Sequence, residues 1–258
     1  MGDHMGIRIR VNAYFRKKII LGVIIIGFLA TIGTILYVDY VWYNDQNRYE
    51  IGSIEIAEEL DFEMSSSRLE VSSSVDAVGM TYSSLELDEI IGSEGQYIDI
   101  DHQYLAYSFY IKNTGSVTKS ITYNIRLSEL MDWMSDSIRI LIIEDDTNYK
   151  MYQKEDQLDL DNNLPLYDQM PIGINFESSP FVFRDTIEDL EPGSIKSFRL
   201  IIWLEEQDPD LVERADIGII QGEFVFTVID DPAYGGSNFM SSSCVVSFGI
   251  HYQDEDII

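Results

Sequence analysis

The sequence predicts a mainly β protein: an extracellular antiparallel β-sandwich, Ig-like or jelly-roll-like, behind one N-terminal transmembrane helix. Three observations predict this architecture. Residues 19–38 form a run of 20 positions without a charged side chain. Beyond that run, apolar and polar residues alternate with a period of two over many short segments, which is typical of strands that bury one face of an antiparallel sheet. Segments with the 3.6-residue period of amphipathic helices are few.

The uncharged run has the length of a membrane span. At about 1.5 Å of rise per residue, a helix of this length covers roughly 30 Å, the thickness of the hydrocarbon core of a bilayer. A cleaved signal peptide has a shorter apolar region followed by a small-x-small cleavage site. The only site of this kind, Thr31-Ile32-Gly33, lies inside the run. We therefore expect the span to be retained, and a cleaved signal peptide is the alternative.

The charges on the two sides of the span orient it. Residues 1–38 carry five basic residues and one acidic residue, a net charge of +4, whereas the other 12 basic and 44 acidic residues of the chain give residues 39–258 a net charge of −32. Basic flanks stay on the cytoplasmic side of a membrane. We predict a plasma-membrane protein with four parts: a cytoplasmic tail (1–18), a transmembrane helix (19–38), a juxtamembrane linker (39–52) and an extracellular β-sandwich domain (53–258).

Strict alternation predicts the strands of the outer part. Within residues 121–127, the apolar side chains Ile121, Tyr123, Ile125 and Leu127 share one face, and polar residues stand between them. The same pattern recurs at 198–204, 223–230 and 244–252. Further strands are predicted at 53–59, 68–75, 80–88, 97–111, 138–144, 147–153 and 180–184. The apolar parity changes around 101–104, which predicts a bulge or a tight turn.

Two short helices and one long loop complete the prediction. Asp208 has the chemistry of a helix N-cap, proline follows it at the first helical position, and Gly218 ends the segment, so residues 208–218 are expected to form two turns at most. A second short helix is expected within 128–135. Residues 154–179 have little periodicity and contain prolines, which predicts a long loop, and long ordered loops often carry function.

Composition and the absence of known motifs exclude several classes of partner and activity. The sequence pI is about 4.1, and the part predicted to lie outside the cell, residues 39–258, has no basic segment that could neutralise phosphates, so nucleic acid is excluded as a partner. The single cysteine, Cys244, allows no intramolecular disulfide and lies on the apolar parity of its strand, so we expect a buried, inert thiol. The sequence contains no zinc-protease, nucleophile-elbow or phosphate-loop motif. We therefore predict that the protein is not an enzyme.

The best-shaped candidate site is an acidic stretch in the long loop. Asp159, Asp161 and Asn163 stand at alternate positions, a spacing that aims side-chain oxygens at one calcium ion. The calcium-loop pattern then fails, because Leu164 occupies the position of the turn glycine and Met170 that of the bidentate glutamate. The segment is either a weak calcium site or only a solvated acidic loop. No other cofactor is predicted.

Several short motifs resemble a known group of proteins. Lys112-Asn-Thr-Gly115 ends one predicted strand, residues 136–143 form another, and Glu191-Pro-Gly193 opens a third. This arrangement resembles exported surface proteins of Gram-positive bacteria and their wall-less relatives, among them the group around the biofilm fibre protein TasA and camelysin. The resemblance implies an extracellular β-sandwich and assembly by strand exchange. The chain departs from the group by keeping a span and by offering no zinc ligand set.

These expectations define three candidate functions. The first is a membrane-anchored, acidic, surface-displayed β-sandwich that acts as a structural, adhesive or complex-forming module, with a protein partner or self-association at the cell surface. The second is a ligand- or ion-sensing ectodomain that works with a partner protein, because an 18-residue tail is too short for an output domain. The third is an extracellular hydrolase.

Overall fold

The computed structural model describes residues 54–76, 79–154, 171–208, 211, 218–229 and 243–253. The chain separates into two units, 1–50 and 51–258, and every described residue belongs to the second. The predicted tail, span and linker lie outside the described residues. Within the described part, no helix combines the length and the apolar character that crossing a membrane requires.

The described chain forms twelve strands and three short helices. The strands before the long loop are β1 (Ile54–Ala57), β2 (Arg68–Asp76), β3 (Gly95–Tyr97), β4 (Leu105–Asn113), β5 (Lys119–Leu130), β6 (Ile138–Glu144) and β7 (Asn148–Gln153). Those after it are β8 (Gly173–Asn175), β9 (Phe181–Leu190), β10 (Ile195–Leu204), β11 (Gly218–Ile229) and β12 (Ser243–Gln253). The helices are the 3-10 turns η1 (Tyr82–Ser84) and η2 (Asp132–Met134) and the α-helix α2 (Leu87–Gly92).

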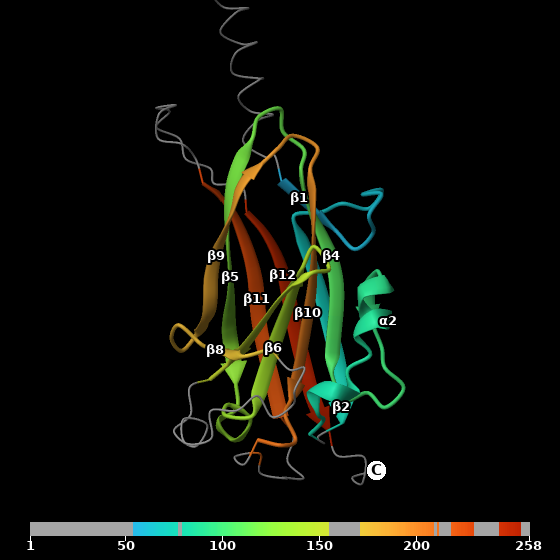
Figure 1. The fold of residues 1–258 in the computed structure, drawn as a ribbon, viewed down its shortest axis with the longest axis vertical. Coiled ribbons are helices and arrows are strands. Elements are labelled where there is room, and N and C mark those ends of the chain that lie inside the picture. Colours follow the sequence, from blue (N-terminus) through green and yellow to red (C-terminus); the bar gives the residue numbers. More distant parts are fainter. Residues whose placement is uncertain are drawn as a thin grey trace, which may run out of the picture. The chain divides into compact units, whose positions relative to one another are not determined.

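The strands form two sheets (Figure 1). One sheet has the order β1-β4-β10-β6-β7-β8, and β3 also pairs with β4; the other has the order β2-β12-β11-β5-β9. The mainly β, two-sheet prediction is confirmed. It was too simple in one respect, because β2–β12 and β7–β8 are parallel pairs. β2 and β12 lie far apart in the chain, and 19 residues separate the end of β7 from the start of β8, so no tight hairpin forces the strands of either pair to run in opposite directions.

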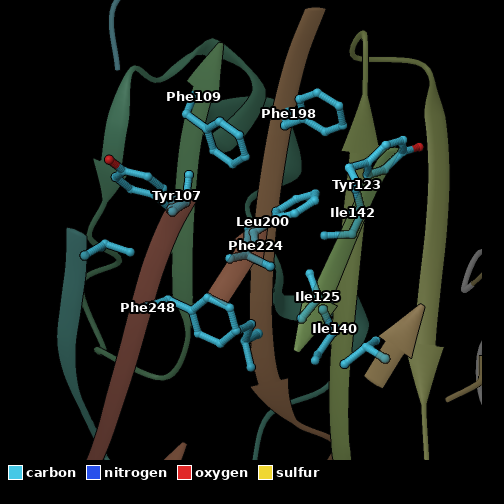
Figure 2. Close-up of a cluster of buried hydrophobic side chains, with 14 of the residues drawn as sticks. Tyr107, Phe109, Tyr123, Ile125, Ile140, Ile142, Phe198, Leu200, Phe224 and Phe248 are labelled. Carbon is cyan, nitrogen blue, oxygen red and sulfur yellow. The ribbon is translucent and has the colours of Figure 1, made fainter. Parts of the chain in front are cut away.

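The apolar side chains of the alternating strands pack into the core between the two sheets, as predicted. Along β5, Ile121, Tyr123, Ile125 and Leu127 are all buried, as their shared parity predicted. Aromatic rings from both sheets meet there: Phe224 and Phe226 of β11 lie 4.6 Å apart between ring centroids, and Phe226 lies 5.1 Å from Phe198 of β10. Figure 2 shows Phe198 and Phe224 among the buried side chains of this core.

A second, smaller apolar cluster covers the outer face of the seven-stranded sheet. Strand β10 is buried on both faces, because Ile201 and Trp203 point away from the main core and lie under Tyr82 and Ile90. The strand predicted at 80–88 is therefore wrong: this segment forms η1 and the start of α2, which lies outside the sheets in Figure 1. The apolar residues that suggested a strand pack instead on the outer face of the seven-stranded sheet. Tertiary packing therefore decides the conformation of this segment, although its local sequence pattern is typical of a strand.

Three further segments refine the predictions. The strand predicted at 97–111 is two strands, β3 and β4, and His102 in the turn between them has φ of 48°, so the predicted change of parity is a tight turn. In the segment predicted as a helix at 128–135, β5 continues through Leu130 before the short turn η2. The helix predicted at 208–218 falls almost wholly outside the described residues.

Candidate functional site

Four polar side chains meet where the two sheets face each other across one edge of the sandwich. Tyr123 of β5 and Asp185 of β9 come from the five-stranded sheet, and Glu144 of β6 and Lys150 of β7 come from the seven-stranded sheet. We call these four residues the intersheet cluster. They line a cleft of about 300 Å³ together with residues that include Thr186 and Lys196. The cluster is the candidate functional site.

Local structure explains how the chain brings these side chains together. The β6–β7 hairpin turns through Asp145 and Asp146, which both have positive φ, 48° and 60°, and the backbone N–H of Thr147 donates to the carbonyl of Glu144 at 3.2 Å. The strands pair again at Glu144 and Asn148, so three residues lie in the loop, and in this register Lys150 lies opposite the buried Ile142. Because directly opposed residues share a face, Lys150 points toward the five-stranded sheet rather than outward. On that sheet, Asp185 lies opposite Tyr123 in the β5–β9 ladder.

The four side chains bond to one another. Lys150 Nζ donates to Asp185 Oδ2 at 2.6 Å and to Glu144 Oε1 at 3.1 Å, and the hydroxyl of Tyr123 donates to Glu144. The side chains of Lys150 and Glu144 are only 22% and 17% exposed. A lysine held between two carboxylates on opposite sheets ties the sandwich together at this edge.

The cluster also shifts the protonation equilibria of its members. Burial, followed by the hydrogen bond to Glu144, raises the pKa of Tyr123. Burial alone would lower the pKa of Lys150, but its hydrogen bonds to Asp185 and Glu144 outweigh this effect and raise it. Burial alone would raise the pKa of Asp185. The hydrogen bond from Lys150 outweighs the effect of burial, so the pKa of Asp185 is lowered. At neutral pH the lysine is charged and Asp185 is ionised.

The neighbouring acidic residues also form ion pairs with basic side chains. Asp145 pairs with Lys196, and Asp146 lies 3.2 Å from Arg199, whose side chain is 3% exposed. In the part of the chain that the structure describes, no three His, Cys, Asp or Glu side chains are arranged to hold a metal ion. Cys244 is buried as predicted, and burial raises the pKa of its thiol to about 12.

The predicted calcium residues, Asp159, Asp161 and Asn163, lie outside the described residues. Calcium binding by this loop stays a prediction: we expect any such binding to be weak, with Kd of about 10⁻⁴–10⁻³ M, because the turn glycine and the bidentate glutamate are missing. Calorimetric titration of the full chain with calcium measures it, and the double variant Asp159→Ala/Asp161→Ala should abolish the signal. Equal calcium binding by the double variant would show that the general acidity of the surface is responsible.

Sequence reasoning missed a buried ion pair on the outer face of the seven-stranded sheet. Arg139 donates from Nη2 to Asp208 Oδ2 at 2.7 Å, and the two side chains are 2% and 0% exposed. Beside them, Trp203 Nε1 donates to Glu205 Oε2 at 3.1 Å. Burial raises the pKa of Glu205 despite this hydrogen bond and the nearby Arg139. A signal was present in the sequence, because Arg139 shares its parity with Leu141 and Ile143, which are apolar.

Comparisons with known proteins give a distant likeness to other β domains. No protein-family model and no curated protein sequence matches the chain. Among solved structures, the N-terminal domain of PorA is 8% identical, with a TM-score of 0.33, over 77% of this chain and 96% of that one. The adhesive subunit of a fimbria of enterotoxigenic Escherichia coli is 9% identical, with a TM-score of 0.34, over 79% and 50%.

A PapD-like domain of a human protein is 8% identical to the chain, with a TM-score of 0.29, over 80% of this chain and 87% of that one. At these TM-scores the likenesses carry no argument about function. The assignment of the chain as a two-sheet β domain rests on its own strand order.

Proposed function

We propose that the protein is a single-pass membrane protein, with its N-terminus in the cytoplasm, that displays an acidic β-sandwich at the cell surface as a structural, adhesive or complex-forming module. The observation that carries this proposal is the charge step across residues 19–38, from a net +4 before and within the run to −32 after it. Basic residues before an uncharged run of this length retain the preceding tail inside the cell.

The intersheet cluster favours a structural module over the alternatives. Its lysine, tyrosine and two carboxylates bond to one another across the two sheets, so they hold the sandwich together. The strongly acidic surface suits a protein partner or a second copy of the chain that presents basic groups or bridging cations. The motifs that resemble exported surface proteins agree with display outside the cell.

Membrane topology provides the test. We expect the full chain, expressed in a bacterium, to leave the membrane only in detergent, and protease added to intact cells to digest the sandwich. The membrane-bound product should retain residues 19–38. As a control, deletion of residues 19–38 should leave the sandwich inside the cell and protected from the protease. A mature N-terminus near Thr34, found by peptide mapping, would show that the segment is a cleaved signal instead.

A further inference from the structure

Lysine side chains contact aspartate carboxylates at three places in the described residues. The pairs are Lys150–Asp185 at 2.6 Å, Lys154–Asp136 at 2.9 Å, and Lys196–Asp145. In the last two pairs, all four side chains are between 37% and 45% exposed. Lys150 differs from the other two lysines because it is 22% exposed and, within the described residues, is the one that also contacts a second carboxylate, that of Glu144.

The surroundings of Lys150 are those of a core edge rather than a solvated surface. Tyr152, two residues along β7, stacks on Phe183 of β9 with 4.5 Å between ring centroids, and Phe183 lies two residues before Asp185. Tyr123 meets the same Phe183 ring edge-on at 5.7 Å. Figure 2 shows Tyr123 at the side of the aromatic group, with its hydroxyl pointing away from the other rings. These packed rings hold β7 and β9 beside each other next to the Lys150–Asp185 pair, in which the Asp185 side chain is 41% exposed.

We propose that Lys150 and Asp185 condense to form an isopeptide bond that covalently joins β7 to β9, with Glu144 as the proton-transferring group. In this step the neutral amine nitrogen of Lys150 attacks Cγ of the protonated Asp185 carboxyl. A C–N bond forms, and the C–O bond to the hydroxyl breaks. Glu144 accepts a proton from the nitrogen and delivers one to the leaving hydroxyl, so water departs and Glu144 ends as it began.

The reaction balances without any co-reactant. An ammonium and a carboxylate hold the same number of protons as an amine and a carboxylic acid, so moving one proton within the ion pair generates the reacting forms. The oxygen of Glu144 that accepts from Lys150 also accepts from Tyr123, which fixes its position. No group is oxidised or reduced, because one amine and one carboxyl become one amide and one water molecule.

Proximity drives the condensation. Two reacting groups held in contact by a packed fold behave as if they were present at an effective concentration of about 10⁵–10⁸ M, which offsets the unfavourable equilibrium of amide formation in water. The ion pair acts in the other direction, because it raises the pKa of Lys150 and lowers that of Asp185. The neutral reacting forms are therefore minor species, and we expect a slow reaction that each molecule undergoes once after folding.

The bond would join the two sheets at an edge that is otherwise held by noncovalent contacts. It connects residues 35 positions apart in the chain and closes a loop that includes the predicted calcium segment. Neither sheet could then separate from the other at this edge without breaking a covalent bond. The inference does not depend on membrane anchoring, because every group in it belongs to the sandwich.

Peptide mapping of the purified full chain tests the proposal. Trypsin cleaves after a free lysine but not after one whose amine is acylated. We therefore expect the wild type to lack cleavage at Lys150 and to yield a branched peptide that joins residues 140–154 to the peptide containing Asp185. The mass of this species should be lower than the sum of its two components by one water molecule.

Matched variants locate the bond and the role of Glu144. Lys150→Arg and Asp185→Ala should abolish the mass loss, and Lys196→Arg should retain it. Asp185→Asn should release ammonia instead of water, which changes the mass loss accordingly. Glu144→Gln should slow bond formation after refolding by at least tenfold. Ordinary cleavage at Lys150 in the wild type overturns the proposal whatever the variants do, as does a bond found at Lys154 or Lys196.

Discussion

Replacing Phe224 with alanine should destabilise the sandwich by about 3–5 kcal/mol, the range measured for large aromatic residues truncated in protein cores. Phe224 is fully buried, and its ring contacts aromatic side chains from both sheets, including Phe109 and Phe198, each at 5.6 Å between ring centroids. The loss combines the transfer free energy of the ring with the cavity that these rigid neighbours cannot close. Because a typical domain is stable by only about 5–15 kcal/mol, this change alone approaches the unfolding threshold.

Denaturant unfolding of the full chain in detergent, followed by tryptophan fluorescence, measures this effect. Val225→Ala is the matched control, since Val225 is the next residue on β11 but lies on the partly exposed face, and it should cost less than about 1 kcal/mol. Similar losses for Phe224→Ala and Val225→Ala would mean that the two sheets do not pack through this aromatic group.

Asp208→Ala should produce a loss of comparable size, about 3–5 kcal/mol, because it removes one carboxylate from a buried ion pair and leaves the charge of Arg139 buried without it. The side chain of Arg139 is 2% exposed, so water cannot replace the lost oxygen without opening the structure. Glu205 lies close enough to interact with Arg139, but its carboxylate already accepts from Trp203.

Two further variants distinguish the contribution of the buried charge to stability from that of side-chain packing. The double variant Arg139→Met/Asp208→Leu should recover most of the stability, since a buried pair replaced by apolar groups of similar size is often neutral or stabilising. Asp136→Ala removes the carboxylate that pairs with Lys154, in a pair whose side chains are 43–45% exposed, and should cost about 0–1 kcal/mol. If Asp208→Ala behaves like Asp136→Ala, then the charge of Arg139 is compensated by other groups, and the Asp208 pair contributes little.

The functional candidate was only partly visible in the sequence. Alternation placed Tyr123 on the buried face of its strand, but nothing in the pattern brought it to Glu144, and nothing marked Lys150 as the lysine that faces the other sheet. That role depends on the register of the β6–β7 hairpin, in which Glu144 pairs with Asn148 across the turn at Asp145 and Asp146. The acidic loop that did attract attention, at Asp159, lies outside the described residues.

By itself, the sequence determined that the part after residue 52 is a two-sheet β structure and which side chains of strands such as β5 and β11 face the core, because burial of one strand face repeats every second residue and is therefore a local signal. Only the tertiary structure decided that β10 is buried on both faces, that residues 80–88 form helical turns, and which charges meet. Asp185 and Lys150 are 35 residues apart, and Asp208 and Arg139 are 69 apart. Such pairs depend on strand order and register, which local periodicity does not encode.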